Sequence, residues 1–250
     1  MTTPDPTDGP RSFVDADLRG ARFVRADLSG AVMRAVEVDG ADIDAPWLAD
    51  GSLRVNGVEV AAYVESELCR RFPGRELRAA PDVAGLRRAW SVLEQSWAVL
   101  LDRIAAMPAG TAEVSVDDEW SFAQTLRHLV MATDTWLGRG VLGQEQPYHP
   151  LGLPNSEYAT DGYDTSVFQE TVPSYDEVLA VRADRQARVR DHLAGLTDDG
   201  LAAPARNPWD PAHDVTVRSC LYVVLEEEWE HQRYAVRDLD AIATAPPDLP

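Results

Sequence analysis

A segment near the C-terminus pairs a glutamate with a histidine at a spacing that could support chemistry. In LYVVLEEEWEHQRYAVRDLD, Leu221 to Asp240, Glu227 and His231 are four residues apart. At about 3.6 residues per helical turn, their side chains stack one turn apart on one face. Val224 and Tyr234 continue this face, which is otherwise apolar. Both polar groups therefore need partners, because burying either one alone costs several kcal/mol.

Two explanations fit this pair. In one, Glu227 and His231 hydrogen-bond to each other, as helical residues four apart often do. In the other, both bind a divalent metal ion, and a third ligand comes from elsewhere in the chain. The search for that ligand is short, because the chain has only five histidines.

His128 is the histidine expected on or beside a buried helix face. It lies in WSFAQTLRHLVMATDTWL, where apolar or small residues recur at helical spacing: Phe122, Thr125, Leu129, Ala132 and Trp136. Surface or capping positions are expected for the others, His149, His192 and His213. His128, Glu227 and His231 are thus the triple that could converge from two core helices.

Four long helices are predicted to position this triple, over about residues 82–107, 121–139, 174–196 and from 216 onward. The first has the seam of a helix bundle, with apolar residues at alternating spacings of four and three: Leu86, Trp90, Leu93, Trp97, Leu100 and Ile104. Ser121 is a candidate N-cap, and Ser174 to Glu177 reads as a capping box. Four-helix bundles often hold metal ligands that project inward from facing helices.

The N-terminal part has a different pattern. The predicted repeat region is residues 11–46, of which 11–45 read as blocks of five, RSFVD ADLRG ARFVR ADLSG AVMRA VEVDG ADIDA, each with an apolar centre. The blocks resemble the pentapeptide-repeat family, which implies a right-handed quadrilateral β-helix with four blocks per coil. Seven blocks make fewer than two coils, and a stack that short cannot bury its own core.

A connector, residues 47–80, is predicted to join the repeats to the bundle of residues 81–240. Asn56-Gly57 predicts a hairpin turn between apolar strand positions, and AAYVESELCRRF predicts a helix that ends before Pro73. The loop between the second and third bundle helices has some 30 residues, a length typical of functional lids or disordered segments. Residues 1–10 and 241–250 are expected to be disordered.

Composition excludes several classes of function. The net charge of −19, with no clustered cations among 23 arginines, argues against a nucleic-acid partner. No apolar run approaches the roughly 18 residues of a membrane span. The N-terminal residues lack the pattern of a secretory signal, and two cysteines are too few for a disulfide framework. We therefore expect a cytoplasmic protein whose Cys69 and Cys220 are small core residues.

The segment W-S-x(6)-H-L-V from Trp120, a long loop, and E-x-x-x-H followed by Q-R-Y-A-V-R-D-L together resemble the DinB/YfiT-like superfamily of metal-binding four-helix bundles. The resemblance covers about residues 82–240. Typical members use three histidines, the last two as H-x-x-x-H, whereas Glu227 stands at the first of these positions here. The mycothiol-dependent maleylpyruvate isomerase branch has a His, Glu, His set. The resemblance thus implies that His128, Glu227 and His231 are the metal ligands.

This ligand set indicates a class of chemistry. Two imidazoles and one carboxylate leave Zn²⁺ an open position, as in catalytic zinc sites, and the set also suits Fe²⁺ or Ni²⁺. A thiol bound there would be a thiolate. We therefore expect a metal-dependent S-transferase or isomerase that uses a small-molecule thiol, mycothiol by resemblance, on a small electrophile. The alternative is a non-catalytic metal-binding interaction protein whose repeat module docks a partner.

Five further residues are weaker candidates for the site. Tyr234 could orient a ligand or donate a proton, and Glu228 is a second catalytic candidate that could also close the metal as a fourth ligand, as could His213. Arg182 and Arg185 could bind an anionic group of the thiol or substrate. The alternatives are core packing for Tyr234 and solvated positions for the two arginines.

Overall fold

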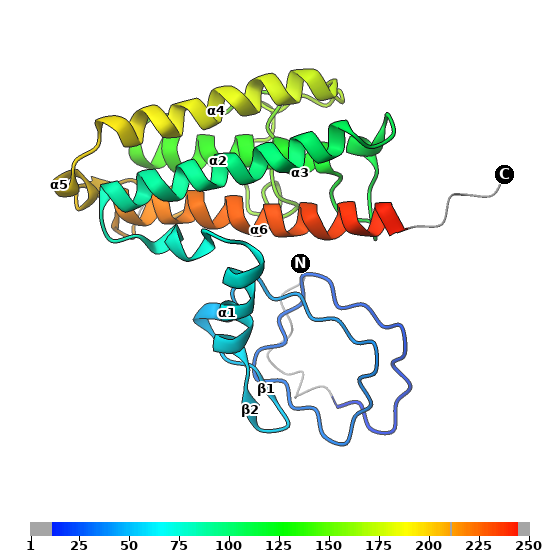
Figure 1. The fold of residues 1–250 in the computed structure, drawn as a ribbon. Helices are drawn as coiled ribbons and strands as arrows, with labels where there is room; N and C mark the ends of the chain where they lie inside the picture. Colours follow the sequence, from blue (N-terminus) through cyan, green and yellow to red (C-terminus); the bar gives the residue numbers. More distant parts are fainter. Residues whose placement is uncertain (1–11, 211, 245–250) are drawn as a thin grey trace. The chain divides into compact units, whose positions relative to one another are not determined.

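A computed structural model describes residues 12–210 and 212–244 (Figure 1). The chain divides into two compact units, one that ends at Ala45 and one that begins at Pro46. Each unit is described by itself below. The segments 1–10 and 245–250, expected to be disordered, lie outside the described residues.

The repeat unit turns at every fifth residue. Gly20, Gly30 and Gly40 have φ angles of 72–73°, and the residues halfway between them also have positive φ. Each of these glycines is the third residue of a turn closed by a backbone hydrogen bond, such as that from Ala31 N to Leu28 O at 2.9 Å. Glycine adopts this left-handed geometry without steric cost, which explains its recurrence every ten residues. No strand is assigned within residues 12–45.

The apolar centres of the repeat blocks are exposed, as the shortness of the stack predicts. Their exposed fractions lie between 46% and 64% at Phe13, Leu18, Phe23, Leu28, Met33, Val38 and Ile43. A solenoid buries its core between neighbouring coils, and fewer than two coils leave these side chains without a cover from their own unit.

The connector forms the predicted hairpin and helix. Strands β1 (Arg54–Val55) and β2 (Val58–Glu59) pair antiparallel around Asn56 and Gly57, whose φ angles of 51° and 82° are those of a type I′ turn. Three helical segments complete it: η1 (Leu48–Asp50), α1 (Ala61–Arg71) and η2 (Arg75–Ala79).

The second unit is built on a four-helix bundle (Figure 1). Its long helices are α2 (Val83–Ala105), α3 (Phe122–Thr133), α4 (Tyr175–Gly195) and α6 (Val217–Thr244). Helices α2 and α3 each pack against both α4 and α6. Shorter elements join them: η3 (Thr111–Glu113), η4 (Asp134–Val141), α5 (Asp198–Leu201), β3 (Pro204–Ala205) and β4 (Val215–Thr216), the last two paired antiparallel.

The helix signals in the sequence correspond to local structure. The predicted seam of α2 is buried throughout, and its two tryptophans are among the largest buried side chains. Ser121 and Ser174 cap α3 and α4, each in a complete capping box with Gln124 and Glu177 respectively. These reciprocal bonds satisfy backbone groups that a helix start would otherwise leave unpaired.

Two predicted boundaries differ from the structure. The second bundle helix changes after Thr133 into the π-helix η4, and π-helical segments are frequent near functional sites. The last helix continues to Thr244, so residues 241–244 are helical rather than disordered. Its apolar stripe extends through the buried Leu239 to Ile242, which packs against the core and supports the extra turn.

The long loop between η4 and α4 is folded rather than disordered. Its Tyr148, Tyr158, Tyr163 and Phe168 form a small aromatic cluster against Met131 of α3, together with Trp209 from the segment between β3 and β4. Ring centroids in this cluster lie 5.0–6.5 Å apart, the range of favourable edge and offset contacts. Aromatic burial therefore orders a segment whose length is typical of lids or disordered loops.

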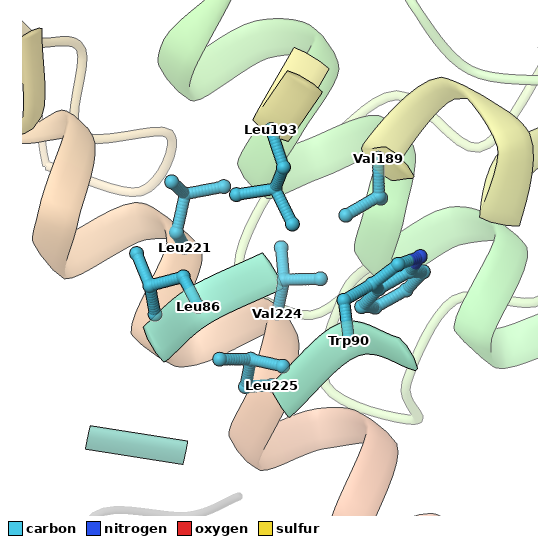
Figure 2. Close-up of a pocket in the computed structure, with 7 residues that line it drawn as sticks. All are labelled: Leu86, Trp90, Val189, Leu193, Leu221, Val224 and Leu225. Atoms are coloured by element: carbon cyan, nitrogen blue, oxygen red, sulfur yellow. The ribbon is translucent and has the colours of Figure 1, made fainter. Parts of the chain in front are cut away.

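Two further features bear on ligands. Among the described residues, no helix combines the length and the apolarity that crossing a membrane requires. A cavity of about 10 Å³ lies between α2, α4 and α6 (Figure 2), lined by Leu86, Trp90, Val189, Leu193, Leu221, Val224 and Leu225. Its lining is apolar and its volume is about that of one water probe, so it is a packing defect and not a substrate site.

Candidate metal centre

Helices α3 and α6 bring together the three residues that the sequence singled out. One possible ligand atom from each of His128, Glu227 and His231 lies within 4.8 Å of the others. The Nε2 atom of His128 is 3.5 Å from Oε2 of Glu227. A tetrahedral ion with bonds of about 2.0–2.1 Å separates its ligand atoms by roughly 3.3 Å, so the distance between His128 and Glu227 matches a metal of this kind.

One ring nitrogen of each histidine is hydrogen-bonded to a backbone carbonyl oxygen. Nδ1 of His128 lies 3.0 Å from the carbonyl oxygen of Leu153, and Nδ1 of His231 lies 2.8 Å from that of Glu227. A carbonyl oxygen can only accept, so each Nδ1 carries the hydrogen and each Nε2 is left to act as a ligand. Metal-binding histidines in proteins generally make this outer bond.

Neither imidazole forms a hydrogen bond of normal length with the carboxylate of Glu227. Its Oε2 atom lies 3.4 Å from Nδ1 of His231 and 3.5 Å from Nε2 of His128, beyond the usual 2.7–3.2 Å range of N–H···O bonds. The simple hydrogen-bonded pair is thus a poor description, because the His231 hydrogen goes to the backbone instead.

Electrostatics favour the metal-binding protonation states. Burial, with a contribution from nearby His128, lowers the pKa of His231 to about 4, so its imidazole is neutral near pH 7. Burial alone would raise the pKa of Glu227, but its contacts with His128 and His231 hold it below the ordinary value. The centre therefore contributes a carboxylate and a neutral imidazole, both in the form that a metal ion binds.

The indole ring of Trp120 packs beside the rings of the two histidines, a role that the sequence did not predict. Its ring centroid is 4.6 Å from that of His128 and 6.2 Å from that of His231. The preceding turn carries positive φ angles at Asp117 and Asp118 and leads directly into the Ser121 cap. The tryptophan immediately before a helix cap, eight residues before His128, was the available signal.

Comparison with known families agrees with this architecture. A family model of the DinB superfamily matches residues 92–235, more than half of the chain. The chain belongs to the DinB superfamily. A model of pentapeptide repeats (8 copies) matches residues 12–44. Searches of curated proteins and of solved structures found no match.

Tyr234 lies beside the centre of this DinB domain. Its ring meets that of His231 edge to face, with centroids 5.7 Å apart at 86°. The guanidinium groups of Arg233 and Arg237 lie 4.5 and 5.3 Å from its centroid. The tyrosine is therefore held by ring and cation contacts next to His231, one of the candidate ligands.

Three other candidates, Glu228, Arg182 and Arg185, form ion pairs elsewhere in the DinB domain. Glu228 is buried and paired with Arg182, on a different side of α6 from Glu227. Arg185 is buried and bonds Asp134 at 2.7 Å. Neither arginine is solvated, and neither has its charge available for an anionic ligand. Their spacing with Val178, Val189 and Leu193 places them on the buried stripe of α4.

The remaining histidines and the cysteines are also outside the cluster. His213 is exposed and contacts Asp210, so it does not serve as a fourth ligand. His149 accepts a bond from the Leu151 N–H, and His192 is partly buried near the end of α4. Cys220 is fully buried, and burial raises its pKa to about 11, whereas Cys69 is partly buried. Neither thiol is placed to act as a nucleophile at the centre.

Proposed function

We propose that this DinB-superfamily protein is a metal-dependent enzyme that uses a low-molecular-weight thiol, such as mycothiol, to conjugate or isomerise a small electrophile. The observation that carries the proposal is the convergence of His128, Glu227 and His231 with both Nδ1 atoms committed to backbone carbonyls.

The number of protein ligands supports catalysis over a purely structural metal. Within the described residues the cluster contains three ligands, and neither His213 nor Glu228 joins it. Structural zinc sites almost always have four protein ligands, whereas catalytic sites have three and leave a position for water or substrate. Zn²⁺ is the first candidate, with Fe²⁺ or Ni²⁺ compatible with the same donors.

The proposed chemistry follows from that open position. A divalent ion there would hold a bound thiol as the thiolate, the nucleophilic form, at neutral pH. The protein's own contribution is to keep the imidazole of His231 neutral, to fix the orientation of both imidazoles and to flank them with Trp120. The partially exposed Glu227 side chain marks the side from which small molecules can approach.

The first test is elemental analysis of the purified protein, with His128→Ala and His213→Ala as a matched pair of histidine variants. We expect about one metal per chain in the wild type and in His213→Ala, and loss of the metal in His128→Ala. Cobalt substitution followed by addition of a thiol should then produce a thiolate-to-cobalt absorption band. Equal metal content in the two variants would rule out the assigned ligand set.

A second function is supported by the exposed apolar centres of the repeat unit. Such a surface suits a protein whose metal site stabilises the bundle while the repeats bind a partner. Turnover distinguishes the two functions. Conjugation of a thiol with a model electrophile, abolished in His128→Ala, supports the enzyme. A metal-loaded protein that binds no thiol in the cobalt experiment supports the interaction protein.

A further inference from the structure

The ring of His128 is oriented by a short piece of the long loop, residues 149–153. The carbonyl oxygen of Leu153 accepts the bond from Nδ1 of His128 at 3.0 Å, and the Leu153 N–H donates to the carbonyl of Arg127 at 3.1 Å. The loop is therefore bonded to two consecutive residues of α3, one of which is a candidate ligand. Any shift of this segment changes the hydrogen-bond partner that selects the His128 tautomer.

Arg127 holds the middle of the same segment. Its side chain is buried, with 8% of the residue exposed, and its Nε donates to the carbonyl oxygen of Leu151 at 2.9 Å. Within the part of the chain that the structure describes, Arg127 forms no ion pair with a carboxylate. A buried cation without a counter-ion is costly, so its retention here needs a reason beyond general stability.

Asp134 holds the start of the segment. Its buried carboxylate accepts the His149 N–H at 2.9 Å, and Arg185 of α4 fixes that carboxylate through bonds of 2.7 and 3.1 Å. Leu151 N–H in turn donates to the ring of His149 at 3.1 Å. The segment is thus anchored by charged residues at its start and its middle, before it reaches His128.

Gly152 allows the segment to lie close against α3. A Cβ atom at this position would come within 3.1–3.2 Å of the His149 carbonyl, the Phe168 ring and the Cβ of Met131. Contacts of that length require the neighbours to move. The absence of a side chain at Gly152 therefore sets how near the Leu153 carbonyl can approach His128.

We propose that residues 149–153 form a positioning element for the metal centre, and that Arg127 is its principal positioning residue. Arg127 acts through the loop, which fixes the tautomer and the ring orientation of His128 and so the affinity of the centre for its metal. The inference rests on the proposed function only in that His128 is a metal ligand. The tautomer itself is a property of the metal-free protein.

The test compares Arg127→Met with Arg87→Met. Arg87 is a matched control because it also bonds backbone carbonyls, those of Leu193, Ala194 and Leu196, but it lies on α2 and is exposed. Zinc affinity is measured by chelator competition, the His128 tautomer by ¹⁵N NMR of metal-free protein, and stability by urea unfolding. Loss of an outer-shell contact of this type typically weakens metal binding about 10–100-fold.

We expect that loss in Arg127→Met, with mixed His128 tautomers, and wild-type affinity in Arg87→Met. Arg127→Lys keeps a donor near Leu151 and should restore part of the affinity. A drop in affinity that merely follows stability, without a tautomer change, would overturn the proposal, as would unchanged affinity and tautomer. Gly152→Ala is the second variant should Arg127→Met not fold, and it should weaken binding in the same way. An unaffected tautomer and affinity there would refute the positioning role.

The experiment separates this inference from the proposed function. If the wild type binds no zinc, the metal-dependent function fails, and the tautomer of metal-free protein still decides the inference. A single Nδ1–H tautomer in the wild type that becomes mixed in Arg127→Met supports the positioning role. The same populations in both proteins contradict it. If the wild type binds zinc and Arg127→Met binds it equally well, the function stands and the positioning role falls.

Discussion

Glu227 and Glu228 are neighbours in α6, yet they satisfy their charges in different ways. Glu228 is 1% exposed and its carboxylate is paired with the guanidinium of Arg182, which is 3% exposed. Glu227 faces two imidazoles at 3.4 and 3.5 Å, and among the described residues no arginine contacts it. One carboxylate therefore has an arginine as its counter-charge, whereas the other lies between two imidazole rings.

This difference shows how one helix can serve stability and function at adjacent positions. Consecutive helical residues point about 100° apart, so the two carboxylates enter different environments. A buried carboxylate that is ion-paired with an arginine is no longer available as a metal ligand or as a catalytic group. A carboxylate that lies between imidazole nitrogens keeps its charge available for a cation, which is the basis of the proposed metal site.

The largest expected contrast is in metal content. Glu227→Gln removes the negative ligand and should reduce bound metal from about one per chain to trace levels, measured by elemental analysis. The double variant Arg182→Met/Glu228→Leu removes the neighbouring pair together and should retain the metal, because neither residue is a ligand. Metal loss in the double variant with retention in Glu227→Gln would reverse the roles assigned to the two carboxylates.

The Arg182–Glu228 pair, which should not affect metal content, should have a large effect on stability. Arg182→Met leaves Glu228 as a buried charge without its partner, which costs about 3–5 kcal/mol. The double variant removes that charge as well and should recover most of the loss. Urea unfolding of metal-free protein measures both. A single variant as stable as the wild type would show that the pair is not a closed buried ion pair.

The pH dependence of metal-free protein tests the imidazole side of the comparison. The pKa of His231 is about 4 in the folded protein and about 6.5 when unfolded, so the unfolded chain binds an extra proton between these values. Stability is then fully present above pH 6.5 and falls as the pH decreases toward 4. At about 1.4 kcal/mol per pKa unit, the loss is at most about 3 kcal/mol.

His231→Gln removes this titration and should flatten part of the decline. His213→Gln changes an exposed histidine and should keep the wild-type slope. Unfolding free energies at several pH values between 7 and 4.5, measured with a chelator present, provide the comparison. Identical slopes in all three proteins would show that folding does not lower the pKa of His231, contrary to the environment described above.

Helical periodicity accounts for what the sequence could predict here. The α2 seam, both capping serines and the placement of His128, Glu227 and His231 on facing helices all depend on spacing within one segment. Spacing within a segment is visible in a sequence. The five-residue period is predictable for the same reason.

Pairing between distant segments accounts for what the sequence could not predict. Arg182 meets Glu228 46 residues later, and Arg185 meets Asp134 51 residues earlier, so both arginines read as free from their own helix. Glu228 was a catalytic candidate because the sequence shows its direction from α6 but not its partner. The Leu153 carbonyl had no signal at all, because every residue has one.

The smallest effect is expected for Tyr234→Phe, which tests whether the tyrosine next to His231 has a chemical role. The ring keeps its edge-to-face contact with His231 and its two arginine contacts, so the variant changes only the hydroxyl. If Tyr234 acts by packing, stability should change by about 1 kcal/mol or less, and zinc affinity and thiol conjugation should stay within about threefold of wild type. Competition binding and turnover in parallel measure this. Retained metal with turnover reduced more than tenfold would instead make the hydroxyl a proton donor, and would place a chemical role on the Glu227 side of α6.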